Sequence, residues 1–463
     1  MFRIQAKIAP SVLEALLLIL GIIAIMSVSI IKFGALPHIP ILISILLLLI
    51  YGAFKRISFK DLELGMMDGA RAGLGAIFIF FFIGILISAL MMGGTIPSLI
   101  YVGFLTISPH FFFAIVFLIA CVVGVAVGSS LTTTATVGVA FIGMASAMDL
   151  SLAITAGAIV SGAFFGDKMS PLSDTTNLSS SIMQVDLFDH IKNMAWTTIP
   201  ALVISTILFA ILSPTKELKQ TEAIDQFKEA LLKTDLIHWY AFIPVALLVI
   251  MAFKKVPAIP TLAITSFVAI IIGLFIHPYT ATEVMSILYD GFKSTTGLKE
   301  IDSLLTRGGL VSMFSTIGLV LLALSMGGLL FTLGIIQAIL LKVEHLLRRP
   351  RSVIAGAAGT AIGINTLIGE QYLSILLTSE AFQDQFKKAG LHSKNLARVV
   401  EDAGTVVNPL VPWSVCGIFI TTVLAVPTTE YFPFAFFCLL SPILTVLFGF
   451  TGKTLTYLKS DES

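Results

Sequence analysis

Charged residues are scarce in this sequence. Of its 463 residues only 12% are Asp, Glu, Lys or Arg, whereas about a quarter is usual in a soluble domain. Residues 72–148 contain none of the four, and 57% of the whole chain is hydrophobic. A soluble fold of this length interrupts its apolar stripes with charge every turn or two. A soluble enzyme is therefore disfavoured, and a polytopic, all-α membrane protein is predicted.

Cysteine clusters and excess charge are also missing. The three cysteines, Cys121, Cys416 and Cys438, lie in apolar runs without C-x-x-C spacing, which excludes disulfide frameworks, thiol redox motifs and zinc sites. The formal net charge is +1, so nothing favours nucleic acid as a partner. Neither His-Glu-x-x-His nor Gly-x-Ser-x-Gly occurs, so an intramembrane hydrolase is not expected, and no cofactor is expected.

One extended polar segment divides the chain near its middle. Short signatures recur on its two sides in the same order. They are Pro-His-Ile-Pro at 37–40 and Pro-Ala-Ile-Pro at 257–260, Ala-Leu-Met-Met-Gly-Gly at 89–94 and Ala-Leu-Ser-Met-Gly-Gly at 323–328, and Ser-Pro-Leu at 170–172 and Asn-Pro-Leu at 408–410. We therefore predict an internal duplication, with a first repeat at 1–212, a polar linker at 213–237 and a second repeat at 238–463.

Lysine and arginine indicate that the repeats are inverted, because these residues stay on the cytoplasmic side of short loops. Residues 105–110 and 149–160 contain neither, whereas their counterparts in the second half are basic, with Lys342 and Lys387 among their residues. We predict two inverted repeats, each of about five transmembrane helices plus a re-entrant hairpin and a broken helix, with both termini cytoplasmic.

The threading places one hairpin and one broken helix in each half. The hairpins are predicted at 111–148 and 351–390, and the broken helices at 150–185 and 395–426. The same threading requires residues 73–107 and 309–346 to be long, tilted single spans. The Gly-Gly pairs at 93–94 and 327–328 leave the alternative that each is two helices joined by a turn.

Interruptions of apolar spans mark the candidate sites, because irregular backbone inside a bilayer is tolerated only where protein or a water-filled cavity satisfies its polar groups. The four interruptions are the first tip (128–134), the first break (166–177), the second tip (363–370) and the second break (404–412). Their hydroxyls, amides, carboxylates and free carbonyls suit a hard monovalent cation, and helix N-termini there could hold a carboxylate substrate.

Asp167, Lys168 and Asp174 stand in the first break, after a nearly uncharged stretch. Ionisable groups within a membrane are expensive enough to be functional by default. Burial disfavours a charged carboxylate and a bound cation favours it, so Asp167 and Asp174 are predicted to exchange a proton for a sodium ion. The alternative is an Asp167–Lys168 pair that only neutralises itself, or a loop nearer the surface.

Glu401 and Asp402 precede the second break and are predicted as further proton carriers, with a helix-end salt bridge to Arg398 as the alternative. Glu370 follows the second tip and is predicted either to coordinate the ion or to be an ordinary hairpin residue. His190 is expected to be a plain loop histidine, with pH sensing as its alternative role.

Thirteen polar residues of the tips and breaks, Lys168 and Glu370 among them, are predicted to bind substrate or cation. They are Ser129, Ser130, Thr132, Thr133, Lys168, Ser170, Ser173, Asn177, Asn365, Thr366, Glu370, Thr405 and Asn408. The sodium ligands proper are predicted to be Asp174, Ser129, Ser130, Asn365 and Asn408. The alternative for each Ser and Thr is a hydrogen bond to its own helix backbone.

The string Gly-Ala-Phe-Phe-Gly-Asp-Lys-Met-Ser-Pro-Leu-Ser-Asp-Thr-Thr-Asn-Leu at 162–178 resembles the signature of the NhaC family of bacterial sodium/proton antiporters. The Pro-His-Ile-Pro segment at 37–40 and the Gly-Ser-Ser of the first tip are similar to that family as well. The resemblance implies a secondary antiporter of the bacterial cytoplasmic membrane, not an enzyme, that exports Na⁺ in exchange for H⁺. It also implies the fold of the ion transporter superfamily, with a homodimer and an elevator mechanism.

Two other functions are weighed against sodium/proton exchange. One branch of the same family exchanges malate, taken up with protons, for lactate and sodium. Asn365-Thr366 is similar to the Ser-Asn-Thr tips of sodium/dicarboxylate carriers, although Ile364 replaces the Ser. A cation channel would need symmetric rings of polar residues in an oligomer, and the paired breaks argue against it. The expected partners are therefore Na⁺, H⁺ and the bilayer, with malate and lactate as the alternative substrates.

Overall fold

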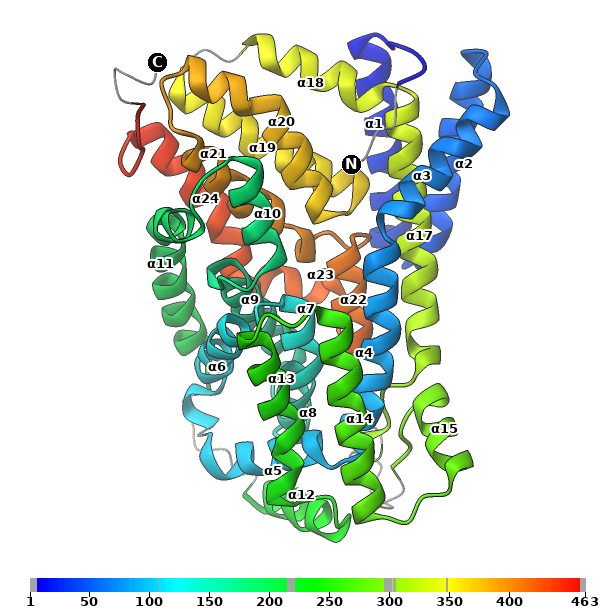
Figure 1. The fold of residues 1–463 in the computed structure, drawn as a ribbon, viewed down its shortest axis with the longest axis vertical. Coiled ribbons are helices and arrows are strands. Elements are labelled where there is room, and N and C mark those ends of the chain that lie inside the picture. The colour runs from blue at the N-terminus through cyan, green and yellow to red at the C-terminus, as the bar shows by residue number, and fades with distance from the viewer. Residues whose placement is uncertain are drawn as a thin grey trace.

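A computed structural model describes residues 6–107, 109–214, 221–294, 302, 305–346 and 349–458. Within these ranges the protein is a bundle of helices without strands, elongated along the vertical axis of Figure 1. Eight of the described helices are long and apolar enough to cross a membrane, or up to ten if each of two bent pairs is one span. The chain is a polytopic, all-helical membrane protein.

The helices of the first half run up to the polar segment. They are α1 (Val12–Ser27), α2 (His38–Phe54), α3 (Phe59–Ala72), α4 (Leu74–Met92), α5 (Thr95–Thr106), α6 (Phe112–Val127), α7 (Ser130–Thr133), α8 (Val139–Ala147), α9 (Leu152–Met169), α10 (Asp174–Ile182) and α11 (Leu187–Leu212). A π-helical segment, η3 (Thr134–Gly138), joins α7 to α8.

The helices of the second half follow α12 (Thr221–Lys233). They are α13 (Ile243–Phe253), α14 (Ala258–Ile276), α15 (Ala281–Asp290), α17 (Leu310–Thr332), α18 (Ile335–Leu346), α19 (Pro350–Ile368), α20 (Gln371–Lys388), α21 (Ser393–Val400), η5 (Glu401–Thr405), η6 (Asn408–Leu410), α22 (Val415–Leu424), α23 (Thr428–Tyr431) and α24 (Phe436–Thr451). The predicted linker, 213–237, contains α12, while its residues 215–220 lie outside the described part.

The prediction of long single spans at 73–107 and 309–346 is wrong. In the first half α4 ends at Met92, and the chain turns at Gly93-Gly94, where Gly94 has φ +71°. In the second half the Gly-Gly pair lies inside α17, and the turn falls at Gly334 instead, with φ +64°. Helices α5 and α18 then lie across the lower and upper ends of Figure 1. A continuous apolar run carries no signal for such a change of direction.

Each half contains a helical hairpin. In the first, α6 ends at Gly128, which has φ +70°, and Ser129 caps the next helix by accepting a hydrogen bond from the Thr132 N–H at 3.3 Å. In the second, α19 ends at Gly369 with φ +75°, and Glu370 caps α20. The first hairpin extends into the lower half of Figure 1 and α19 and α20 into the upper half.

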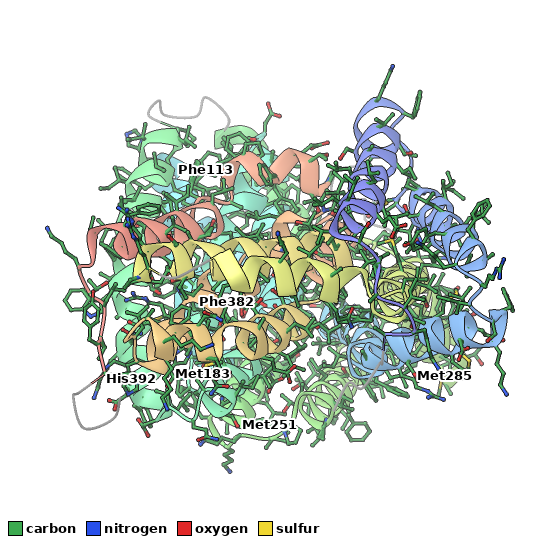
Figure 2. The ribbon with its side chains drawn as sticks, turned by 90° about the horizontal axis from the view of Figure 1, so that it is seen from above. Phe113, Met183, Met251, Met285, Phe382 and His392 are labelled. Carbon is green, nitrogen blue, oxygen red and sulfur yellow. The ribbon has the colours of Figure 1, made fainter. Side chains whose placement is uncertain are left out.

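Each half also contains an interrupted helix, which follows the hairpin of that half in the sequence. Helix α9 ends at Met169, and α10 begins at Asp174 after Ser173 caps its first turn. In the second half, residues 393–410 and 415–424 form two segments bent by 44°. Seen from above, the yellow and orange helices of the second half run across this end, with Phe382 near the centre and the blue helices to one side (Figure 2). Residues 166–168 at the end of α9 and all residues of η5 and η6 are buried, so both interruptions begin in the interior of the bundle.

Close backbone contact fixes the first hairpin on α9. Gly124 of α6 and Gly166 of α9 touch, and a Cβ on Gly166 would overlap the backbone of Gly124. We expect Gly166→Ala to destabilise the protein by about 1–3 kcal/mol, because neither backbone can move aside. Thermal unfolding in detergent measures this loss. Gly359→Ala in α19, where nothing lies within 4 Å of the added Cβ, is the control and should not lower the melting temperature.

Candidate functional site

A cavity of about 440 Å³ lies where the first tip and the first break meet. We call it the central cavity. Its lining includes Gly128, Ser129, Ser130 and Thr132 of the first tip, Asp167, Pro171, Asp174, Thr175 and Asn177 of the first break, Gln371 and Tyr372 after the second tip, and Lys255, Pro257, Ala258 and Thr261 at the start of α14. Three of the four predicted interruptions thus contribute to it or adjoin it.

Asp167 links the first break to the first tip. Its Oδ2 accepts hydrogen bonds from the Ser130 backbone N–H at 3.2 Å and from the Ser130 hydroxyl at 2.7 Å, and the Ser173 hydroxyl lies near the same carboxylate. The side chain is 5% exposed. The carboxylate is therefore held at the N-terminus of α7, where backbone N–H groups favour negative charge.

Asp174 is the second acidic group of the central cavity. It is the first residue of α10 and is exposed to the cavity, whereas its neighbours Ser173 and Thr175 are buried. Asn177, one turn later, lines the same cavity, and its side-chain amide donates to the carbonyls of Pro171 and Ser173. Two carboxylates thus face one polar cavity, which suits a cation with oxygen ligands.

Several predicted ligand hydroxyls donate hydrogen bonds to other groups of the protein. Thr133 donates to the Ser129 carbonyl at 2.9 Å, and Ser170 donates to the Val125 carbonyl at 2.8 Å. Thr132 donates to the Ser129 hydroxyl at 3.0 Å. These bonds hold the tip in shape, which is a common role of Ser and Thr in membrane helices.

The second tip and second break form a separate polar cluster. Asn408 donates its amide to the Asn365 Oδ1 at 2.8 Å, and the Asn365 amide donates to the Gly404 carbonyl. Both asparagines are fully buried, and neither lines the central cavity. The five predicted sodium ligands are therefore divided, with Asp174, Ser129 and Ser130 in the central cavity and the two asparagines in this cluster.

Three further candidates lie around this second cluster. The Glu370 carboxylate accepts from the Leu373 N–H at 2.8 Å and so caps α20. Thr366 donates its hydroxyl to the Ile362 carbonyl, in its own helix. Thr405 is buried at the end of η5.

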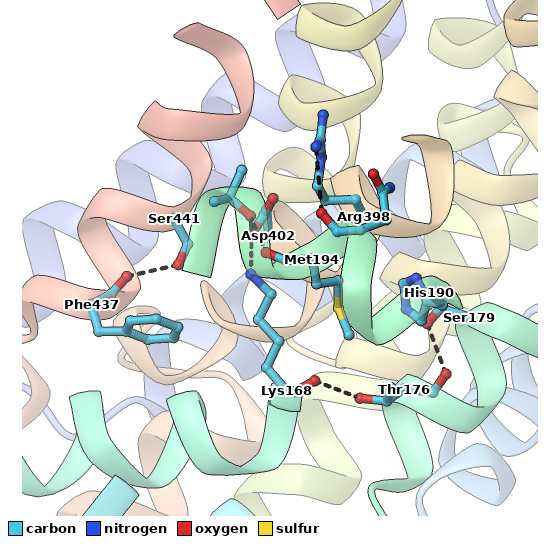
Figure 3. A network of polar contacts seen from close by, with 11 residues as sticks. Lys168, Thr176, Ser179, His190, Met194, Arg398, Asp402, Phe437 and Ser441 are labelled. Carbon is cyan, nitrogen blue, oxygen red and sulfur yellow. Dashed lines mark hydrogen bonds and ion pairs between the residues drawn. The ribbon is translucent and has the colours of Figure 1, made fainter. Parts of the chain in front are cut away.

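Lys168 follows Asp167 directly in α9 but makes an ion pair with Asp402 of η5 (Figure 3). Both side chains are 0% exposed, and the Thr197 hydroxyl donates to the same Asp402 oxygen at 3.1 Å. The structure therefore contains neither the Asp167–Lys168 pair nor the Asp402–Arg398 bridge weighed from the sequence. Lys168 also does not line the central cavity.

Glu401 belongs to a hydrogen-bonded row that the sequence did not reveal. The Ser179 hydroxyl donates to the Glu401 Oε1 at 2.8 Å and lies 3.0 Å from the His190 Nε2. His190 is fully buried in α11, so its prediction as a plain loop histidine is wrong. Ser179 and His190 are eleven residues apart and are brought together by the turn between α10 and α11.

In the described part of the chain no group of three or more His, Cys, Asp or Glu side chains could hold a metal ion.

The model of the Na⁺/H⁺ antiporter family matches residues 162–453. The chain belongs to the Na⁺/H⁺ antiporter family. The match begins at the first residue of the signature string and covers both breaks and the second tip. The family predicted from that string is confirmed.

The proteins to which this chain is similar differ in the substrates that their names give. The chain is 41% identical to the Na⁺/H⁺ antiporter NhaC of Alkalihalophilus pseudofirmus over 94% of this chain and 95% of that protein. It is 35% identical to the arginine/ornithine antiporter ArcD of Halobacterium salinarum, over 98% and 94%. It is 31% identical to the malate-2H⁺/Na⁺-lactate antiporter of Bacillus subtilis, over 98% and 97%.

Proposed function

We propose that this protein exchanges Na⁺ for H⁺ across the bacterial cytoplasmic membrane, with Asp167 and Asp174 as the carboxylates that bind either ion. The observation that carries the proposal is the placement of both acids at one polar cavity, where Ser130 holds Asp167 at the first tip. A carboxylate in this setting binds a proton when the cavity lacks a cation and releases it when a cation arrives. Membership of the family and the NhaC relative support the same exchange.

The transport movement belongs to the same proposal. We propose two inverted repeats and an elevator mechanism in a homodimer, with both termini cytoplasmic. The opposite placement of the two hairpins, and of α5 and α18, at the lower and upper ends of Figure 1 supports the inverted arrangement. In this mechanism the two tips would expose the central cavity alternately.

Exchange of malate with protons for lactate and Na⁺ is the second candidate. Lys255 lines the central cavity and supplies a positive charge there, which a carboxylate substrate would need now that Lys168 is paired elsewhere. The 31% identical relative carries that activity in its name. Against it, two acidic side chains face the same cavity and repel an organic anion.

A sodium jump applied to proteoliposomes distinguishes the two candidates. Internal pH is recorded with and without malate and lactate on opposite sides of the membrane. We expect a pH change with sodium alone, because the carboxylates exchange one ion for the other. A pH change that requires both organic acids would overturn sodium/proton exchange in favour of the second candidate.

A further inference from the structure

A second group of buried acids lies beside the central cavity without lining it. Asp167 and Lys168 are consecutive in α9, and Glu401 and Asp402 are consecutive in η5. Asp167 accepts from Ser130 of the first tip, whereas Lys168 pairs with Asp402 of η5 (Figure 3). The end of α9 therefore connects the central cavity with the acids of η5.

The charges of this group leave Glu401 without a counter-ion. Lys168 and Asp402 neutralise each other in their ion pair. Arg398 is 1% exposed and donates to the carbonyls of Asn193 and Thr454, and the described residues show no ion pair between it and a carboxylate. A buried carboxylate without a counter-ion is expensive, and taking up a proton removes that charge.

Among the described residues, the other elements packed against η5 supply no further counter-ion to Glu401. Helix α24 contains no Asp, Glu, Lys or Arg, and those of α19 and α20 are exposed. The only acid of α10, Asp174, opens to the central cavity, and α21 adds Lys394 two turns from Glu401. The charged groups close to Glu401 are thus the acids Asp167 and Asp402 and the bases Lys168 and Arg398.

The hydrogen bonds among His190, Ser179 and Glu401 indicate which of their atoms carry hydrogen. Ser179 has one hydroxyl hydrogen, for which the Glu401 Oε1 at 2.8 Å is the nearer acceptor and the Thr176 carbonyl at 3.2 Å the more distant one. While Glu401 is an anion that accepts from Ser179, the contact between Ser179 and His190 uses the hydrogen on the His190 Nε2, which leaves Nδ1 as a bare acceptor. Nδ1 is buried and has no hydrogen-bond partner among the described residues. The Glu401 Oε2 makes no hydrogen bond there either, although the Thr405 hydroxyl lies near it.

We infer that Glu401 is a second proton-binding site, reached through Ser179 and His190, which adds one proton to each exchange cycle. A proton that arrives at the His190 Nδ1 releases the Nε2 proton to Ser179, which passes its own hydrogen to the Glu401 Oε1. One proton enters, Glu401 changes from anion to acid, and no other group changes charge. The row ends with each hydrogen bond reversed.

The second site is coupled to the first by charge. A cation bound at Asp167 adds positive charge close to Glu401, which favours the anion of Glu401 and expels its proton. This inference rests on the proposed sodium/proton exchange. Its consequence is an electrogenic cycle that carries more protons than the central cavity alone would release.

The number of protons per sodium ion tests the inference in proteoliposomes. The membrane potential at which net ²²Na⁺ flux stops, at fixed sodium and pH gradients, gives this ratio. We expect the ratio to fall by one in Glu401→Gln, because glutamine keeps an acceptor for Ser179 and cannot bind the proton. Ser179→Ala interrupts the row, so we expect an unchanged ratio and a rate lower by roughly 100-fold.

Matched variants separate the outcomes. Ser180→Ala removes a neighbouring hydroxyl whose one hydrogen bond among the described residues is to the Asn177 carbonyl, and it should leave ratio and rate unchanged. An equal proton-to-sodium ratio in the wild type and in Glu401→Gln would overturn the inference. A folded Glu401→Gln that has also lost the exchange of external for internal sodium would overturn it too, because the variant should lose only the second proton. If Glu401→Gln does not fold, an undiminished rate in Ser179→Ala overturns it. Failure of the wild type to couple sodium to protons would instead contradict the proposed function.

Discussion

Replacing Asp167 with asparagine is expected to abolish sodium-driven proton movement while leaving the protein folded. The asparagine Oδ1 can still accept both hydrogen bonds from Ser130, so the first tip stays in place. The negative charge is lost, and one ion pair contributes about 4 kcal/mol at 4 Å and an effective dielectric constant of 20, roughly a thousandfold in affinity. We therefore expect sodium binding to weaken by at least roughly 100-fold.

The same replacement at Asp174 should give the same loss, because that carboxylate faces the central cavity from the start of α10. Both variants are measured in proteoliposomes by internal pH after a sodium jump. Asp149→Asn is the matched control, since Asp149 is exposed and asparagine adopts its positive φ readily. Wild-type exchange in folded Asp167→Asn and Asp174→Asn would reject the carboxylate mechanism.

Breaking the buried ion pair is expected to have the largest effect on stability. Lys168→Ala or Asp402→Ala leaves one charge fully buried without its partner, which typically costs about 3–5 kcal/mol. The double variant Lys168→Met/Asp402→Leu removes both charges and keeps much of the volume, so we expect it to recover most of this loss. Melting temperatures in detergent measure all three.

An exposed pair provides the comparison for this experiment. Lys192 and Asp189 lie 3.8 Å apart with side chains 78% and 64% exposed, so Lys192→Ala should change the stability by less than about 1 kcal/mol. Single variants at Lys168 and Asp402 that melt like the wild type would show that the pair is not buried as the structure has it. A double variant no more stable than the single variants would show that the two charges do not act on each other.

The sequence was informative where polar residues interrupt an apolar chain. Gly128 and Gly369 end helices within the segments predicted as tips. Pro171 lies between α9 and α10, and Pro409 lies in the three-residue 3₁₀ segment η6 of the second break. These residues stand out because glycine permits positive φ and proline removes a backbone donor, whatever the tertiary fold. The first break could therefore be placed, and its acids recognised as site residues, from local chemistry alone.

Side-chain pairs between segments far apart in the chain could not be predicted from the sequence. Lys168 and Asp402 are 234 residues apart, and the nearer candidates, Asp167 and Arg398, were the only partners that local spacing suggested. The burial of His190 depends in the same way on the packing of α10 and α11 against η5. The turn at Gly334 was missed because the more conspicuous Gly-Gly pair at 327–328 serves close packing instead, Gly328 against α3 and Gly327 against Ile368 of α19.

Proton release on sodium binding tests the central claim most directly. Purified protein in a weakly buffered detergent solution is mixed with sodium chloride, and the pH of the solution is recorded. If Na⁺ and H⁺ compete for Asp167 and Asp174, the wild type releases protons in proportion to bound sodium, and Asp174→Asn does not. Sodium binding without proton release at any pH would contradict the account.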